Sequence, residues 1–410
     1  MSETTIEYAI IGAGPAGAHL ASRLAEAGRE AALFDPRGAW EKPCGGGLTT
    51  RALKEFSFLL ENTSHPCKLI KHITIISPSK LRVTLKVKRP FAIYSRAVLN
   101  GLILDRAVEA GVNFIKSAVS NFQRDAGWWS ITTADGGATR ARFLVGADGA
   151  ASFTRRRLIG IFGVKDLALA FGYNVQDPQP GQNTPEVTVA FRKNFTGYLW
   201  AFPRPGVMNF GVASKLGEQT SDQLRQTLGT FIRDYYGGEM PEPEKMTFFG
   251  AKIPTLDLPT WPTLKATGEG WALIGDAAGF ADPITGEGIY YALKSADLLA
   301  GALLGQNSKG KRSWTTGSMA ANPAPPSYQQ AADAYEQAWR REFGRDLEHA
   351  SYRLTQFYHG LFFGHLMTDA MVWLARRHRG VRTVLLRALM GEQSYVTLKR
   401  DLLLRAFRVV

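Results

Sequence analysis

The stretch from Ile6 to Asp35 restricts the fold more than any other part of the sequence. It contains two apolar runs separated by an amphipathic segment, and the first run leads into Gly12-x-Gly14-x-x-Gly17. In this pattern Gly12 permits a tight strand-to-helix turn, Gly14 lets the backbone approach a pyrophosphate, and Gly17 lets helix and strand pack closely. The phosphates then lie at the positive end of the helix, and Asp35 can accept hydrogen bonds from a ribose hydroxyl. The stretch therefore predicts a Rossmann-like unit that binds a dinucleotide.

A chain of 410 residues is long enough for two or three domains and a large core. Its net charge is +13, and the segment from Trp339 to Val410 holds thirteen Arg or Lys against six Asp or Glu. This segment is also rich in Phe, Leu, Trp and Tyr, which favours a membrane surface or an apolar anionic substrate over nucleic acid. A solvated basic helical face is the alternative.

Cys44 and Cys67 are the only cysteines, and no secretory signal precedes the first predicted strand. Both features favour a reducing, cytoplasmic location without disulfides. The longest apolar stretch, Leu361 to Ala375, contains His365 and Asp369 and is shorter than the ~20 residues of a spanning helix. We therefore expect no transmembrane anchor, and peripheral association with the inner face of the membrane stays open.

A loop from Pro36 to Thr50 contains three successive glycines, Gly45 to Gly47. Because glycines cost chain entropy, such a run indicates close approach of the backbone to a flat or bulky group, such as a flavin ring. A flexible surface loop is the alternative.

The rest of the first half alternates between strands and helices. Residues 68–87 predict two antiparallel strands around a turn at Pro78-Ser79. A helix is expected from Ala97 to Ala110, followed by a parallel strand from Val112 to Ile115. Two more strands, 128–133 and 140–146, lead to Asp148-Gly149.

Between Leu167 and Ser214, strand-like runs separated by Gly and Pro predict an antiparallel sheet laid over the nucleotide-binding part. Its expected inner face is aromatic, with Phe191, Tyr198, Trp200 and Phe202 as the candidates. For any one of these side chains, filling the core is the simpler explanation.

Farther along, a buried strand from Trp271 to Gly275 leads to Asp276, and a helix is predicted from Ile289 to Leu304. This repeats the glycine turn and helix N-terminus of the opening stretch. The Asp276 carboxylate can bind ribityl hydroxyls, and the amides of Gly288 and Ile289 can face a flavin ring.

The glycine motif, the Asp148-Gly149 element and the Gly275-Asp276 element form a set of three, in the order and spacing seen in flavoprotein hydroxylase-like oxidoreductases. Within that superfamily the segments Lys42 to Gly47 and Gly197 to Pro203 resemble hallmark segments of the geranylgeranyl reductase family, whose members saturate isoprenoid double bonds. The resemblance covers roughly residues 5–305 and does not extend to the C-terminal part.

The resemblance implies a bound FAD and a set of residues around it. Those that would contact FAD, beyond Gly12, Gly14 and Gly17, are Ala16, Asp35, Cys44, Gly45, Gly47, Arg96, Val119, Asp276, Gly288 and Ile289. Those that would line the prenyl pocket are Tyr198, Trp200 and Phe202.

The expected fold class is α/β, a Rossmann-like FAD-binding domain with an inserted antiparallel β-sheet substrate domain and a helical C-terminal region. The first domain would comprise residues 1–68, 91–160 and 265–305, and the second residues 69–90 and 161–264. A linker is expected at 306–327, followed by helices over 328–410 that break near 360–364, Gly380 and Gly391.

The implied reaction is the reduction of an isolated alkene in a prenylated lipid, quinone or chlorophyll-type substrate. Such an alkene has no activating carbonyl, so reduction needs a hydride from reduced flavin and a proton at the other carbon, in a dry cavity. Cys44 is the candidate catalytic residue because a thiol beside the ring, protonated at neutral pH, can donate or relay that proton. The alternative is that Cys44 only packs the flavin loop.

Electrons would come from NADPH, with NADH or ferredoxin as alternatives. The histidines have no ligand spacing, so no metal site is predicted. An FAD- and NAD(P)H-dependent monooxygenase acting on aromatic or apolar substrates is the second interpretation. A flavin-carrying lipid-binding protein is the third. The sequence leaves the oligomeric state open.

Overall fold

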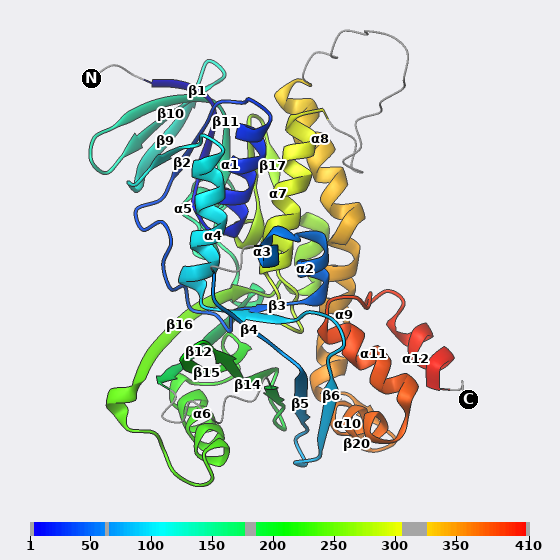
Figure 1. Ribbon diagram of the computed structural model, residues 1–410. Coiled ribbons are helices and arrows are strands. Elements are labelled where there is room, and N and C mark those ends of the chain that lie inside the picture. Colours follow the sequence, from blue (N-terminus) through cyan, green and yellow to red (C-terminus); the bar gives the residue numbers. More distant parts are fainter. Residues whose placement is uncertain (1–3, 62–64, 177–185, 306–325, 407–410) are drawn as a thin grey trace.

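The computed structural model describes residues 4–61, 65–176, 186–305 and 326–406. A layer with a mostly parallel sheet and its helices lies against a second sheet, and helices of the C-terminal region lie beside that second sheet (Figure 1). The expected α/β class, with a Rossmann-like part, a second β-sheet and a helical C-terminal region, is confirmed. The predicted linker at 306–327 falls, except for its last two residues, outside the described residues.

The first sheet is built on buried apolar strands. Its central order is β17-β18-β11-β1-β2-β8, and the pairs β18–β11, β11–β1, β1–β2 and β2–β8 are parallel. These strands are β1 (Thr4–Ile11), β2 (Ala31–Phe34), β8 (Asn113–Ile115), β11 (Ala138–Gly146), β17 (Thr267–Gly268) and β18 (Trp271–Leu273). Parallel strands place their carboxyl ends, and the loops that follow them, along one edge of the sheet.

An antiparallel extension enlarges this sheet. It consists of β9 (Val119–Asp125) and β10 (Trp128–Thr133), which pair with each other and through β10 with β11. The predicted strand at 128–133 is confirmed, whereas β9 had not been predicted because its exposed residues are mostly polar.

Helices pack on one face of the first sheet, and β9 and β10 contribute to the apolar cluster on its other face. The main helices are α1 (Pro15–Glu26), α4 (Arg96–Glu109), α7 (Ile289–Leu303) and α8 (Tyr328–Trp339). Buried residues of α1, α4, α7 and α8 share one hydrophobic cluster with those of the first sheet. Shorter helices are α2 (Thr50–Glu55), α3 (Phe58–Glu61), α5 (Phe153–Leu158), and the 3-10 turns Val164–Asp166, Pro243–Lys245, Leu258–Thr263 and Gly275–Ala277.

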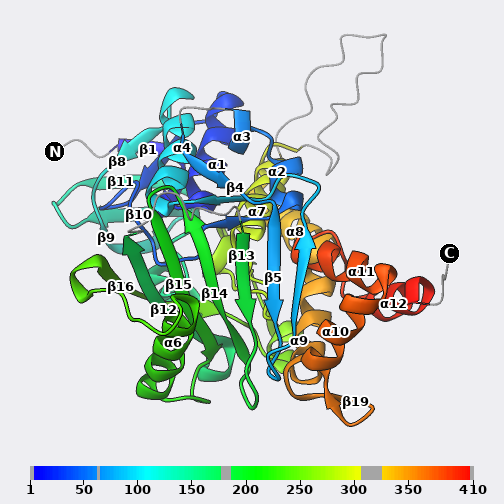
Figure 2. The same ribbon diagram turned by 60° about the horizontal axis from the view of Figure 1, so that its bottom comes forward.

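The second sheet has the order β16-β12-β15-β14-β13-β5-β6. Its strands are β5 (His72–Ile76), β6 (Arg82–Lys86), β12 (Leu167–Gln176), β13 (Glu186–Ala190), β14 (Gly197–Arg204), β15 (Val207–Lys215) and β16 (Met246–Pro254). All neighbours are antiparallel except β13 and β5. The amphipathic helix α6 (Ser221–Tyr235) covers part of one face (Figure 2). A small sheet of β3 (Gly47–Leu48), β7 (Ala92–Tyr94) and β4 (Cys67–Leu69) lies where the two layers meet.

The C-terminal region is helical apart from one hairpin. It contains a π-helical segment (Arg340–Gly344), α9 (Arg345–His359), the hairpin β19 (Leu361–Phe362) and β20 (His365–Leu366), α10 (Met367–Arg377), α11 (Arg379–Leu389) and α12 (Leu398–Ala406). Its apolar residues form one cluster with those of β5, β6 and β13. Among the described helices, none is both long and apolar enough to cross a bilayer.

The helix break predicted at Gly380 is wrong by two residues. The chain breaks at His378, whose backbone is extended, and Gly380 lies inside α11. A Cβ at Gly380 would overlap the carbonyl oxygen of Arg405, so this glycine allows α11 and α12 to approach closely. A glycine that permits helix packing looks, in sequence, like one that ends a helix.

Candidate active site

The glycine turn after β1 has the geometry that its spacing predicts. Gly12 has φ +106°, and a Cβ there would lie 2.5 Å from the carbonyl oxygen of Ala147. A Cβ on Gly17 would overlap the carbonyl oxygen of Gly12, whereas no atom lies within 4 Å of the corresponding position on Gly14. Helix α1 starts at Pro15, and no side chain caps the amides of its first turn. The space over Gly14 therefore suits an anionic group such as a pyrophosphate.

Asp35 follows β2 and ties this turn to the next loop. One carboxylate oxygen accepts the amide of Ala13 at 3.0 Å, and the other accepts the amides of Arg37 at 2.8 Å and Gly38 at 3.0 Å. This network fixes the carboxylate beside the glycine turn. Its predicted contact with a ribose remains a prediction.

One cavity of about 930 Å³ runs between the two layers. The predicted residues that line it are Gly14, Ala16, Cys44, Gly45, Gly47, Arg96, Tyr198, Trp200, Phe202, Asp276, Gly288 and Ile289. Gly12, Gly17, Asp35 and Val119 are not among the lining residues. Val119 begins β9, opposite Thr133, and packs half-buried against the cluster around Phe122. The fold thus brings most of the predicted residues, from distant parts of the chain, to one cavity.

The three-glycine loop packs closely against the protein's own groups. A Cβ on Gly45 would lie 2.7 Å from the Phe202 ring, and one on Gly46, where φ is +80°, would overlap the carbonyl oxygen of Tyr94. The Gly46 amide donates to the Cys44 sulfur at 3.3 Å, and the Arg204 guanidinium donates to the Cys44 carbonyl oxygen. The loop is therefore held in place, with Cys44 on the cavity wall.

Two buried arginines and one carboxylate organise the neighbouring wall. Glu41 accepts the amides of Arg96 at 3.1 Å and Ala97 at 3.0 Å, and the Arg204 guanidinium at 2.7 Å. Burial acts to raise the pKa of Glu41, but these hydrogen bonds and the Arg204 charge outweigh it, so the pKa lies below its usual value. Arg96 is 3% exposed and donates to Asn100 at 3.1 Å, yet its Nε has no hydrogen-bond partner among the described residues. A buried guanidinium with an unused donor on a cavity wall suits a polar or anionic ligand group.

The loop after β18 supplies the opposite wall. Asp276 pairs with Lys42 at 2.9 Å, and a Cβ on Gly288 would lie 3.0 Å from the Asp276 carboxylate. Gly288 is the N-cap of α7 and provides no side-chain cap, and its closeness to Asp276 brings the N-terminus of α7 to this loop. Backbone amides and one carboxylate can hold ribityl and ring atoms of a flavin here.

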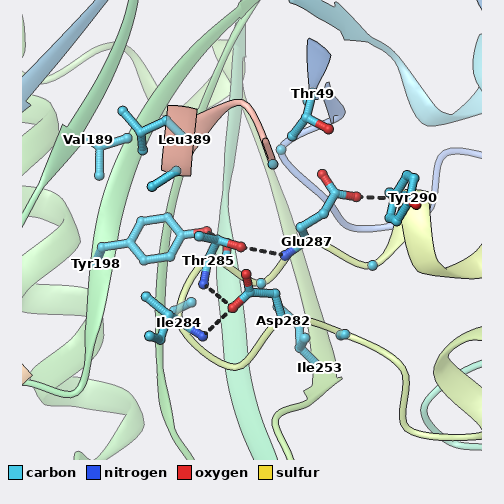
Figure 3. Close-up of a pocket in the computed structure, with 18 of the residues that line it drawn as sticks. Thr49, Val189, Tyr198, Ile253, Asp282, Ile284, Thr285, Glu287, Tyr290 and Leu389 are labelled. Carbon is cyan, nitrogen blue, oxygen red and sulfur yellow. Dashed lines mark hydrogen bonds between the residues drawn. The ribbon is translucent and has the colours of Figure 1, made fainter. Parts of the chain in front are cut away.

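Two acidic residues of the same loop were not predicted as site residues. Asp282 is 6% exposed and accepts the amides of Ile284 at 2.8 Å and Thr285 at 3.2 Å (Figure 3). It also accepts the Tyr395 hydroxyl at 2.8 Å. The Tyr198 hydroxyl donates to the Thr285 carbonyl oxygen. Burial raises the pKa of Asp282. This carboxylate joins the loop to the C-terminal region.

Glu287 is the second of these acids. It lines the cavity directly before Gly288, and its carboxylate accepts the Tyr290 amide at 2.9 Å (Figure 3). Burial raises the pKa of Glu287 to about 7, although that amide and the charge of Arg96 act in the opposite direction. An acid next to the glycine before an apolar helix is the sequence signal that could have identified it.

The far end of the cavity is apolar, and the C-terminal region forms much of it. Its lining residues from α9 to α12 include Phe357, Met371, Leu374, Leu385, Leu389 and Leu402. Tyr198, Trp200 and Phe202 alternate along β14 with ring centroids 5.8 and 6.2 Å apart, and the Trp200 indole donates to Asn209 at 2.7 Å. The helical wall had not been predicted because amphipathic helices of this kind look the same whether they cover a core or a ligand.

Three observations fit FAD: the open space over Gly14, the unpartnered Nε of Arg96, and the helix N-terminus at Gly288 beside Asp276. The comparisons agree. Residues 5–190 match a family model described as FAD binding domain. Over 329 residues the chain is 27% identical to geranylgeranyl diphosphate reductase from Synechocystis sp., covering 75% of this chain and 77% of that protein.

Two further comparisons extend this result. Protein CbrA from Escherichia coli (strain K12) is 30% identical over 321 residues, which cover 74% of this chain and 85% of CbrA. The solved structure of a geranylgeranyl bacteriochlorophyll reductase-like protein from Thermoplasma acidophilum superposes with a TM-score of 0.72 at 20% identity, over 99% of this chain and 96% of that one. The chain therefore belongs to the geranylgeranyl reductase family of FAD-dependent oxidoreductases.

Proposed function

We propose that this oxidoreductase saturates isolated C=C bonds of geranylgeranyl-type prenyl chains carried by lipids, quinones or chlorophyll-type precursors. One observation carries the proposal: the cavity is continuous from the glycine turn at Gly14 to an apolar end between β13, β14 and the C-terminal helices. A long hydrocarbon chain needs such an end, and a polar substrate would leave it unused.

Bound FAD, once reduced, would supply the hydride. The residues expected to hold it are those of the cofactor end: the α1 N-terminus at Gly14 for the pyrophosphate, Arg96 for a polar group, and Asp276 with the Gly288 and Ile289 amides for the ribityl and ring atoms. The Lys42 ammonium and the Asp276 carboxylate form an ion pair at 2.9 Å. Ribityl hydroxyls that bind this carboxylate would therefore share it with Lys42 or displace the Lys42 side chain.

The alkene carbon that does not receive the hydride needs a proton, and two side chains on the cavity wall can hold one. The Cys44 thiol lies on the three-glycine loop, and the Glu287 carboxyl, whose pKa burial raises to about 7, lies before Gly288. We propose Cys44 as the donor and Glu287 as the group that shares or replaces that proton. Tyr198, Trp200 and Phe202 would exclude water and orient the chain.

The test is single-turnover reoxidation without oxygen. Chemically reduced, FAD-loaded protein is mixed anaerobically with geranylgeranyl diphosphate and with geranylgeraniol, and flavin absorbance and the saturated product are followed. Reoxidation with product formation supports the reductase. A requirement for oxygen would point to the monooxygenase, and binding without turnover would point to a lipid carrier.

The proton donor is tested in the same assay. Cys44→Ser and Glu287→Gln are compared at several pH values and in D₂O. A slower alkene reduction with unchanged FAD affinity is expected for the donor, whereas unchanged rates for Cys44→Ser exclude the thiol. The electron donor is assigned by comparing NADPH, NADH and reduced ferredoxin as reductants of the bound flavin.

A further inference from the structure

The hairpin between α9 and α10 exposes large apolar side chains. Leu361 is 66% exposed, Phe362 40% and Phe363 88%, and the Phe362 and Phe363 rings pack edge to face, 4.7 Å apart. Exposed apolar residues gathered in this way on one hairpin mark an interaction site more often than scattered ones do.

The turn of this hairpin holds its most exposed large apolar residue in an unfavourable backbone conformation. Phe363 and Gly364 connect the pair Phe362–His365, and their φ angles are +49° and +81°. Positive φ at both central positions of a two-residue hairpin favours Asn-Gly, and a bulky side chain at the first is unusual. Packing does not compensate Phe363, because most of its surface is exposed. The turn thus presents a phenylalanine outward at a conformational cost.

Positive charge gathers on the two helices that follow the hairpin, α10 and α11. Between Gly360 and Gly391 there are five arginines and one acid, Asp369. That acid is 9% exposed and accepts the backbone amide and the hydroxyl of Ser79, both at 2.9 Å, which brings the β5–β6 turn with its exposed Lys80 beside α10. On α10 itself, Trp373 is 45% exposed with the Arg377 guanidinium 4.2 Å from its ring centroid. Aromatic side chains flanked by cations are typical of the headgroup region of an anionic bilayer.

The hairpin is also continuous with the apolar end of the cavity. Phe362 lines that cavity together with Met367, Ala370 and Met371 of α10. A long apolar molecule that enters beside Phe362 meets hydrocarbon from the surface to the interior. A free aqueous substrate needs no apolar tip outside the entrance.

We propose that the tip of the β19–β20 hairpin inserts into one leaflet of an anionic lipid bilayer and that the prenyl chain passes from that leaflet into the cavity beside Phe362. The identity of the entering chain rests on the proposed function. The insertion itself is independent of it, since lipid binding requires no turnover.

The experiment uses the full-length, FAD-loaded chain and cosedimentation with vesicles of phosphatidylcholine, with or without phosphatidylglycerol. The key variant is Phe363→Asn, which keeps a residue favoured at positive φ and removes the apolar tip. The matched control is Ile161→Asn, because Ile161 is 76% exposed and lies outside the C-terminal region. We expect Phe363→Asn to weaken binding to anionic vesicles by on the order of tenfold and the control to bind like the parent chain.

Two further measurements complete the test. Binding should weaken with salt and in pure phosphatidylcholine, and amides of residues 361–366 should exchange more slowly with solvent when vesicles are present. No vesicle binding, or equal binding by Phe363→Asn, overturns the proposal. Self-association that Phe363→Asn abolishes would instead assign the hairpin to a second copy of this chain. Turnover of a detergent-dispersed prenyl substrate without vesicle binding would reject insertion and leave the proposed function standing.

Discussion

The two ends of the cavity are built in different ways. At the cofactor end, short segments determine the wall through their backbones: the turn at Gly12 to Gly17, the loop at Gly45 to Gly47, and Gly288 before α7. At the apolar end, side chains from β13, β14 and four C-terminal helices meet only after the whole chain has folded. Local motifs therefore specify where a cofactor would be held, and long-range packing specifies which substrate would fit.

This contrast predicts the largest effect at the first glycine turn. Gly17→Ala should both unfold the domain and abolish FAD binding, because the new Cβ would overlap the Gly12 carbonyl oxygen. We expect a loss of more than ~3 kcal/mol in the free energy of unfolding. Gly14→Ala is the matched control for stability, since no atom lies within 4 Å of its new Cβ. Thermal melts without FAD measure the loss of stability, and FAD titration by fluorescence measures the loss of cofactor affinity. A Gly14→Ala protein with normal FAD affinity would contradict the assignment of Gly14 to the pyrophosphate.

The second prediction concerns the link between the two ends. Asp282→Ala removes the acceptor of two loop amides and of the Tyr395 hydroxyl, and leaves these buried donors unpaired. We expect a loss of about 3 kcal/mol in stability, against about 1 kcal/mol for Tyr395→Phe. Urea unfolding of the single and double variants gives the coupling energy. If the two losses simply add, Asp282 does not join the loop to the C-terminal region.

These differences explain how much the sequence could predict. The motif glycines identified the turn, the parallel strands and most of the cofactor-end residues, because their spacing along the sequence is specific to a strand-to-helix turn or to one loop. Their close contacts, such as Gly45 with Phe202, come from other segments and could not be predicted in this way. Glu287 and Asp282 escaped prediction, since an acid becomes unusual only when the fold buries it. The helical wall and the hairpin tip escaped for the same reason: periodicity shows that α10 has an apolar face, but nothing in residues 367–377 says whether that face meets a core, a ligand or lipid.

The third prediction tests whether the C-terminal wall selects the substrate. Leu389→Trp adds volume at the apolar end, where Leu389 and Val189 both line the cavity and belong to one apolar cluster (Figure 3). We expect KM for a geranylgeranyl substrate to rise by on the order of tenfold with unchanged FAD affinity, since the cofactor end is built from other segments. Val396→Trp is the control, because Val396 is 37% exposed and does not line the cavity. An unchanged KM would mean that the prenyl chain of the substrate occupies only the side of the cavity formed by β14.

The smallest expected effect is a pH dependence of the free energy of unfolding that comes from Glu287 at the cofactor end. Burial raises the pKa of Glu287 from 4.5 to about 7, so between these values the folded chain binds more protons than the unfolded chain. The free energy of unfolding therefore falls as pH rises through this range and levels off above pH 7, when the Glu287 carboxylate is ionised. Glu287→Gln keeps an acceptor for the Tyr290 amide and cannot ionise, so it should match the parent chain near pH 4.5 and exceed its stability by ~1–2 kcal/mol at pH 8, after allowance for water in the cavity. Chemical denaturation of the FAD-free protein at both pH values measures the difference, with exposed Glu244→Gln as the control. A stability difference that does not change with pH would place the Glu287 carboxylate in contact with water and remove it as the proposed proton reservoir.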